Sequence, residues 1–110
     1  SEEKLENAEQ AFLKEQWSDS IYHSYTAIIN TAKALLTSEG AKTNTQAGIV
    51  KNFDEVFIAT NKVKLPNSLS NLVYQINKNE PTRAFSEAYL NTAKTFYKAV
   101  DIYRKSIVEN

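Results

Sequence analysis

The residues of this chain that could carry out acid–base chemistry near neutral pH include a single histidine, His23. An imidazole can act as a general base there when a neighbouring group orients it. The nearest carboxylate along the expected helix is Asp19, four residues earlier, where the start of the helix would engage it. We therefore interpret His23 as a surface residue on a polar helix face, and we keep a ribonuclease site around it only as a third hypothesis.

A group of acidic residues near the N-terminus would be the natural place for a metal ion. Its members are Glu2, Glu3, Glu6 and Glu9. A di-metal site in a helical bundle also uses Glu-x-x-His pairs, and the sequence contains none. The absence of cysteine excludes zinc fingers, iron–sulfur clusters and thiolate catalysis. We expect no metal, no cofactor and no catalytic residue, and hence no catalytic activity in this domain.

Three cations near the C-terminus could contact phosphates: Lys94, Lys98 and Arg104. Asp101 lies one turn from both Lys98 and Lys105 and can pair with either. The chain as a whole has 13 basic and 13 acidic residues, which argues against a dedicated nucleic-acid binder. Residues 1–55 hold 5 basic and 9 acidic residues, and residues 56–110 hold 8 and 4. We interpret this asymmetry as complementarity between the packed halves; the alternative is a polar docking surface on the second half.

The elements that position these residues are helices almost throughout, in one domain over residues 1–110. Apolar residues recur every three to four positions in five segments, 3–16, 18–38, 46–59, 66–76 and 82–108, the last with an alternative start at 86. We expect Ser18 and Thr45 to cap the second and third helices, Gly40 to close the second, and Pro66 to open the fourth. The fold class predicted is all-α, an antiparallel bundle of four to five helices.

Two helices have unusual faces. The second carries a stripe of small residues beside its apolar arc: Ser20, Ser24, Ala27, Thr31, Ala34 and Ser38. Small residues let another backbone approach closely, so we expect this helix to be central. The fifth carries a long apolar stripe: Phe85, Tyr89, Ala93, Phe96, Val100, Tyr103 and Ile107. Its edges are widened by Leu90, Tyr97 and Ile102 beyond what one neighbour covers. We expect the fifth helix to be clasped on two sides, or at least one of these edges to meet another chain.

Three stretches together resemble the HEPN superfamily of small helical bundles. They are residues 19–36, residues 43–53 and residues 80–96. The resemblance implies the helical fold, a tendency to dimerise, and nucleotide or RNA binding. Many members are ribonucleases with an Arg-x(4–6)-His motif, but here His23 precedes both arginines, Arg83 and Arg104. Gln46 stands where many members have a histidine. No catalytic residue is therefore carried over.

These observations predict a non-catalytic interaction or accessory domain, forming a homodimer or attached to a larger protein. Ser1 either follows an excised methionine or begins a piece of a longer chain, which we favour. The sequence is similar to the C-terminal appendage of bacterial sulfite or nitrite reductases. The alternative is a nucleotide- or RNA-binding domain of the toxin–antitoxin type, with Lys94, Lys98 and Arg104 on phosphates and Tyr97 beside them. No apolar run has the length of a membrane span. We expect a cytoplasmic location.

Overall fold

The computed structural model describes residues 2–109, and helices make up most of that range. The helices are α1 (Glu2–Leu13), α2 (Trp17–Ser38), α3 (Gln46–Phe53), the π-helical turn η1 (Asp54–Ile58), α4 (Leu69–Lys78) and α5 (Arg83–Glu109). The described residues contain no strand. The all-α bundle predicted from the sequence is confirmed.

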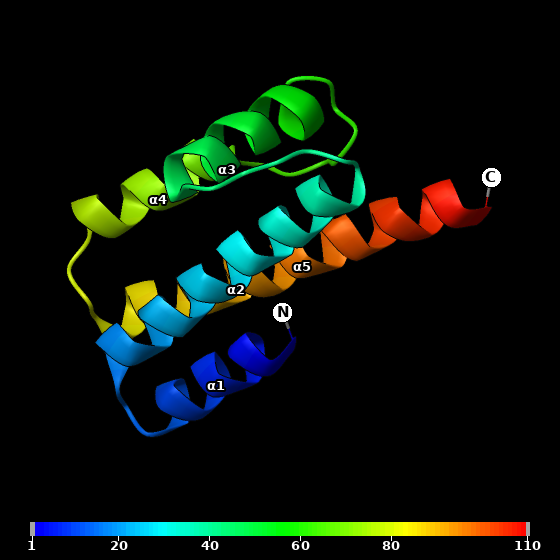
Figure 1. Cartoon of the computed structure of the whole chain (residues 1–110). Helices are drawn as coiled ribbons and strands as arrows, with labels where there is room; N and C mark the ends of the chain where they lie inside the picture. Colours follow the sequence, from blue (N-terminus) through cyan, green and yellow to red (C-terminus); the bar gives the residue numbers. More distant parts are fainter. Residues whose placement is uncertain (1, 110) are drawn as a thin grey trace.

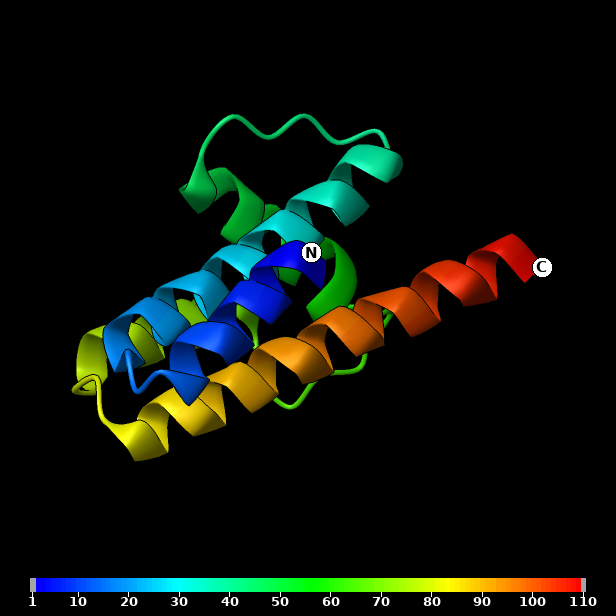
Figure 2. The same cartoon turned by 90° about the horizontal axis from the view of Figure 1, so that it is seen from below.

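Helix α2 is the centre of the bundle. It packs against α1 and α5 on one side and against α3 on the other. Figure 1 shows α1, α2 and α5 lying side by side, with α3 and α4 above them. Figure 2, the view from below, shows α1 seated between α2 and α5 and the far end of α5 extending past its neighbours. The prediction that the second helix is contacted on more than one side is thus confirmed.

The small stripe of α2 explains how closely α1 approaches. Ser20 and Ala27 on α2 are at most 1% exposed, and Ala8 on α1 is 0% exposed. The Ser20 hydroxyl donates a hydrogen bond to the Ala8 carbonyl oxygen at 2.8 Å. Larger side chains at these positions would hold the two backbones apart.

Aromatic rings join the two layers of the bundle. Phe53 of α3 lies between Phe96 of α5 and Phe57 of η1, with ring centroids 5.1 Å and 5.3 Å away. All three rings are fully buried. Aromatic side chains contribute most of the apolar area of a small core, so this cluster is the main attachment of α3 to α5.

The connection between the first two helices is longer than the sequence pattern predicted. Helix α1 ends at Leu13 rather than at residue 16, and Glu15 takes a left-handed conformation with φ of 61°. Helix α2 begins at Trp17, so Ser18 lies inside it and is not its cap. The expected stop at Gly40 is confirmed, because this residue follows the helix with φ of 86°.

The third predicted helix changes pitch midway. Thr45 caps it as expected, accepting a hydrogen bond from the Gly48 amide at 3.0 Å. From Asp54 the turn widens, and the Ala59 amide donates to the Asp54 carbonyl oxygen, five residues back, at 2.8 Å. Wide turns of this kind accommodate one extra residue within a helix.

Helix α4 begins at Leu69, so the prediction that Pro66 lies in its first turn is wrong. The Asp54 carboxylate accepts hydrogen bonds from the Leu69 amide at 2.7 Å and the Ser70 amide at 3.0 Å. Ser68 caps the same end through the Asn71 amide at 3.1 Å. These partners satisfy amides that every helix leaves free at its start, and they fix where α4 begins.

Candidate functional site

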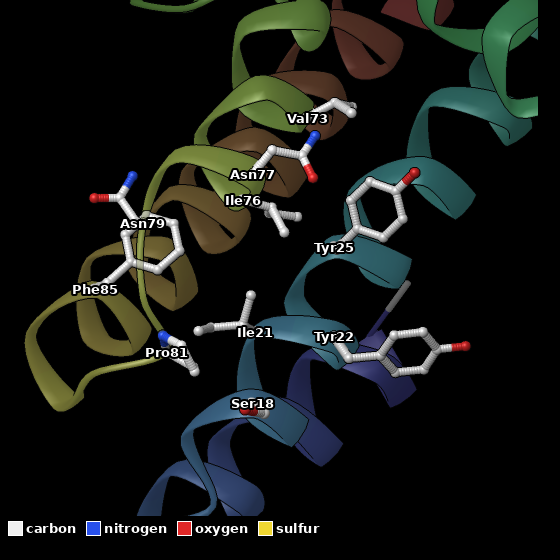
Figure 3. Close-up of a pocket in the computed structure, with 10 residues that line it drawn as sticks. All are labelled: Ser18, Ile21, Tyr22, Tyr25, Val73, Ile76, Asn77, Asn79, Pro81 and Phe85. Carbon is white, nitrogen blue, oxygen red and sulfur yellow. The ribbon is translucent and has the colours of Figure 1, made fainter.

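A groove lies between α2 and α4, and we call it the α2–α4 groove. It has a volume of about 460 Å³. Its apolar wall consists of Ile21, Tyr22, Tyr25, Val73, Ile76, Pro81 and Phe85. Its polar members are Ser18, Asn77 and Asn79. Figure 3 shows the Ile21 and Ile76 side chains pointing into the opening from opposite helices.

The groove exists because α4 is held mainly at its first half. Asp54 fixes the N-terminal end, and the Tyr89 hydroxyl of α5 donates to the Leu72 carbonyl oxygen at 2.9 Å. Helix α4 packs mainly on α3. Its second half, with Val73 and Ile76, therefore stands opposite α2 without closing on it (Figure 3).

Tyr25 marks the boundary between this groove and a second hollow. The second hollow, of about 540 Å³, lies over α3 and shares Tyr25 and Val73 with the first. The Tyr25 hydroxyl donates to the Gln46 side-chain oxygen at 2.8 Å, which fixes the ring in place. Burial raises the pKa of Tyr25, so its hydroxyl remains a donor at neutral pH.

The polar side chains of the α2–α4 groove are only partly engaged. The Asn79 amide nitrogen donates to the Gln75 carbonyl oxygen at 2.8 Å, which leaves the Asn79 side-chain oxygen available as an acceptor. The Asn77 amide and the Ser18 hydroxyl have no hydrogen-bond partner among residues 2–109. The groove therefore offers both donors and acceptors beside an apolar wall.

The three residues expected at an interface occupy different environments. Leu90 is 4% exposed and is already covered within this chain, so our expectation for it needs correction. Tyr97 is half-buried, and its hydroxyl donates to the Glu2 carboxylate at 3.1 Å. Burial, followed by that bond, raises the pKa of Tyr97. Ile102 is 60% exposed. The apolar arc of α5 is wide chiefly because α1 and α2 both pack on it.

The three cations named from the sequence do not form one cluster. Lys94 is paired with Glu9 of α1 at 2.5 Å, which supports the interpretation of complementary halves. Lys98 is exposed. Arg104 lines a hollow of about 200 Å³ together with Tyr97 and Asp101. Asp101 pairs with Lys105 at 3.1 Å, whereas the sequence allowed a pair with Lys98 as well.

His23 is half-buried rather than on an open surface. Its Nδ1 atom is buried without a hydrogen-bond partner among the described residues, and the Tyr22 ring contacts it edge-on at 5.8 Å between centroids. Arg83 is engaged elsewhere, its guanidinium 5.8 Å from the Phe12 ring and 5.9 Å from the Trp17 ring. Residues 2–109 contain no group of three or more acidic or histidine side chains placed to hold a metal ion.

Sequence reasoning did not identify the α2–α4 groove. The available signal was that Tyr22, which lines the groove, lies at the edge of its apolar stripe; it is 63% exposed. None of the described helices combines the length and the apolar character that a membrane crossing requires.

Comparison with known proteins gives one match. The family model described as HEPN domain matches residues 1–105. No curated protein and no solved structure matches the chain.

Proposed function

The chain belongs to the HEPN domain family, and we propose that it is a non-catalytic member that acts by binding another polypeptide. The observation that carries this proposal is the far end of α5, which projects beyond the bundle (Figures 1 and 2). Ile102, Ile107 and Val108 on that end are 60%, 45% and 83% exposed. Ile107 was expected in the core stripe and is instead exposed. Large apolar side chains left exposed at one end of a helix favour a protein-binding surface there.

The absence of the family's catalytic pattern supports a non-catalytic role. The pattern requires a histidine four to six residues after an arginine, and His23 precedes both Arg83 and Arg104. The Arg83 guanidinium packs against the Phe12 and Trp17 rings of α1 and α2, so its role in this fold is structural. We propose that this domain has no ribonuclease activity. Unchanged RNA cleavage by a His23→Ala variant would exclude a ribonuclease site around His23.

The partner in this proposal is a second copy or the remainder of a larger protein. An appendage of a bacterial sulfite or nitrite reductase is one form that the second case would take. The open reading frame around Ser1 distinguishes the two cases directly, because a reductase domain encoded upstream would identify the parent.

Association in solution tests the proposal. We expect sedimentation velocity to show a concentration-dependent increase in mass for the wild type, or a pull-down to recover a partner. Ile102→Glu should weaken that association without changing the melting temperature, because this side chain is exposed. Thr95→Glu, an exposed position earlier on α5, is the matched control. A strict monomer at high concentration with no recovered partner would contradict the proposal.

The alternative is a nucleotide- or RNA-binding domain. It is favoured by the hollow that contains Arg104 and Tyr97, with Lys98 exposed nearby on the same helix. Phosphate contacts weaken steeply with added salt. Binding of RNA or ATP that falls with salt and is reduced by Lys98→Ala would establish this alternative, and no binding at low salt would remove it.

A further inference from the structure

We propose that the α2–α4 groove is a binding site for a small, uncharged, planar heteroaromatic molecule. Its volume of about 460 Å³ lies within the range of roughly 300–1,000 Å³ typical of small-molecule sites. Four segments of the chain contribute to it: α2, α4, the connection between α4 and α5, and the first turn of α5. A site built at the meeting point of several elements is a preformed concavity rather than a flat surface.

The arrangement of side chains favours a flat aromatic ligand. Figure 3 shows the Tyr25 and Phe85 rings on opposite sides of the opening, with Ile21 and Ile76 between them. Phe85 is supported by the Tyr89 ring, 5.4 Å away between centroids, and Tyr25 is fixed by its bond to Gln46. An aromatic ligand gains stacked or edge contacts with such rings in addition to burying apolar area. Because both rings are already held, little conformational entropy is lost on binding.

The polar groups give the ligand an orientation. Asn77 presents a complete amide, and Figure 3 shows it at the rim, directed toward the Tyr25 side of the opening. The Asn79 side chain points away from the opening (Figure 3), and its nitrogen donates to the Gln75 carbonyl oxygen, so Asn77 is the polar group that faces a ligand. A ligand edge carrying an N–H next to a carbonyl oxygen would complement the Asn77 amide through two hydrogen bonds. A few such groups beside an apolar wall are the usual source of specificity in small-molecule sites.

The groove has no charged lining residue, which disfavours an anionic ligand. None of the described residues that line it carries a charge. A phosphate or carboxylate placed there would lose its hydration without an ion-pair partner, which is strongly unfavourable. The site is therefore distinct from the alternative function on α5, where Lys98 and Arg104 would meet phosphates.

A pair of probes with one ring system tests this chemistry. Indole-3-carboxamide is planar, neutral and carries an amide, whereas indole-3-carboxylate differs only in its charged group. Titrations of the isotope-labelled chain, followed by amide chemical shifts, should show carboxamide binding with a dissociation constant below about 1 mM. The shifts should map to Ile21, Tyr25 and Ile76. The carboxylate should bind at least about tenfold more weakly, since tenfold is only 1.4 kcal/mol.

Variants of exposed residues separate the polar contact from the apolar one. Asn77→Leu should weaken the carboxamide about tenfold, as expected for a lost pair of hydrogen bonds, and leave unsubstituted indole within about twofold. Asn71→Leu, the matched control elsewhere on α4, should change neither. Absence of binding by both probes at millimolar concentration would overturn the proposal, and so would equal affinity for the carboxylate. Groove shifts that depend on protein concentration without a probe would show a second copy in the groove and would also overturn it.

Discussion

Helix α2 is packed tightly on its flank toward α1 and left open on its flank toward α4. Toward α1 it presents small residues such as Ser20 and Ala27, and the backbones come close enough for a bond to the Ala8 carbonyl oxygen. Toward α4 it presents Ile21 and Tyr25, and a groove remains. The contrast shows that side-chain size on one helix sets how near a neighbour can lie, while tethers elsewhere determine whether the gap closes.

The tethers of α4 lie away from the groove. Asp54 holds its first turn, and Tyr89 holds the Leu72 carbonyl. Helix α1, by contrast, is held along its length by α2 and α5. Substitutions that enlarge a side chain should therefore lower stability most on the α1 flank of α2. Substitutions that remove a hydrogen bond holding α4 should have their largest effect on the α4 flank. Four experiments test this contrast, in order of decreasing effect on the free energy of unfolding.

The largest effect is expected for Phe96→Ala, because this fully buried ring joins α5 to α3 through Phe53. Removing a fully buried aromatic side chain costs about 3–5 kcal/mol. That is a large share of the roughly 5–15 kcal/mol stability of a small domain. Urea denaturation measures the loss, with the exposed Thr95→Ala as control, expected within about 0.5 kcal/mol. A loss below about 1 kcal/mol would mean that the aromatic cluster between α3 and α5 is not part of the core.

Ala27→Leu tests the tight flank. The position is 1% exposed, and forcing extra methylene groups into a packed contact typically costs about 1–3 kcal/mol. Ala34→Leu makes the same change at an exposed position of the same helix and should stay within about 0.5 kcal/mol. Comparison of the thermal melting curves of the Ala27→Leu and Ala34→Leu variants measures the difference in stability. Equal stabilities would show that α1 can move away without penalty.

Asp54→Ala tests the tether of α4. Loss of a capping carboxylate costs about 0.5–2 kcal/mol, and here two amides and the Ser70 hydroxyl lose their acceptor. Amide hydrogen exchange in α4 should accelerate while α1 remains protected. Glu55→Ala, the exposed neighbour, is the control. Uniform acceleration in both helices would contradict the idea that α4 is held locally.

Tyr89→Phe tests the second tether and should cost about 1 kcal/mol, the usual net value of one hydrogen bond. Burial, with a smaller contribution from Tyr25, raises the pKa of Tyr89. The unfolded chain therefore releases this proton near pH 10, while the folded chain retains it. Stability is intact below that pH and falls as pH rises above it.

The variant should consequently lose less stability between about pH 10 and 11 than the wild type, although Tyr25, Tyr97 and Tyr103, whose pKa values are also raised, keep some slope. Thermal melts across that range give the measurement. If the Tyr89→Phe variant keeps the full slope of the wild type, burial of Tyr89 is not its cause.

Local pattern predicted the helices well and their contacts less well. Apolar spacing and caps such as Thr45 located most of the elements because these signals lie within one turn. The start of α4 was missed because it depends on Asp54, fifteen residues from Leu69. The groove could not be predicted for the same reason, since it follows from where α4 is tethered. Leu90 was named as a possible interface residue because sequence alone does not show that the rest of the chain buries it.

The wide turn η1 fixes the number of residues that the chain can have between α3 and the end of this turn. Each residue of an α-helix advances the side-chain direction by about 100°. Deleting one residue from 54–58 would restore a regular helix and rotate Asp54 by about that angle relative to the buried Phe57. Either the ring would leave the core or the carboxylate would leave the start of α4. Related domains with one residue fewer here should therefore hold their fourth helix by a different side chain, whereas the loop at 42–44, which lies outside the helices, should tolerate changes in length more readily.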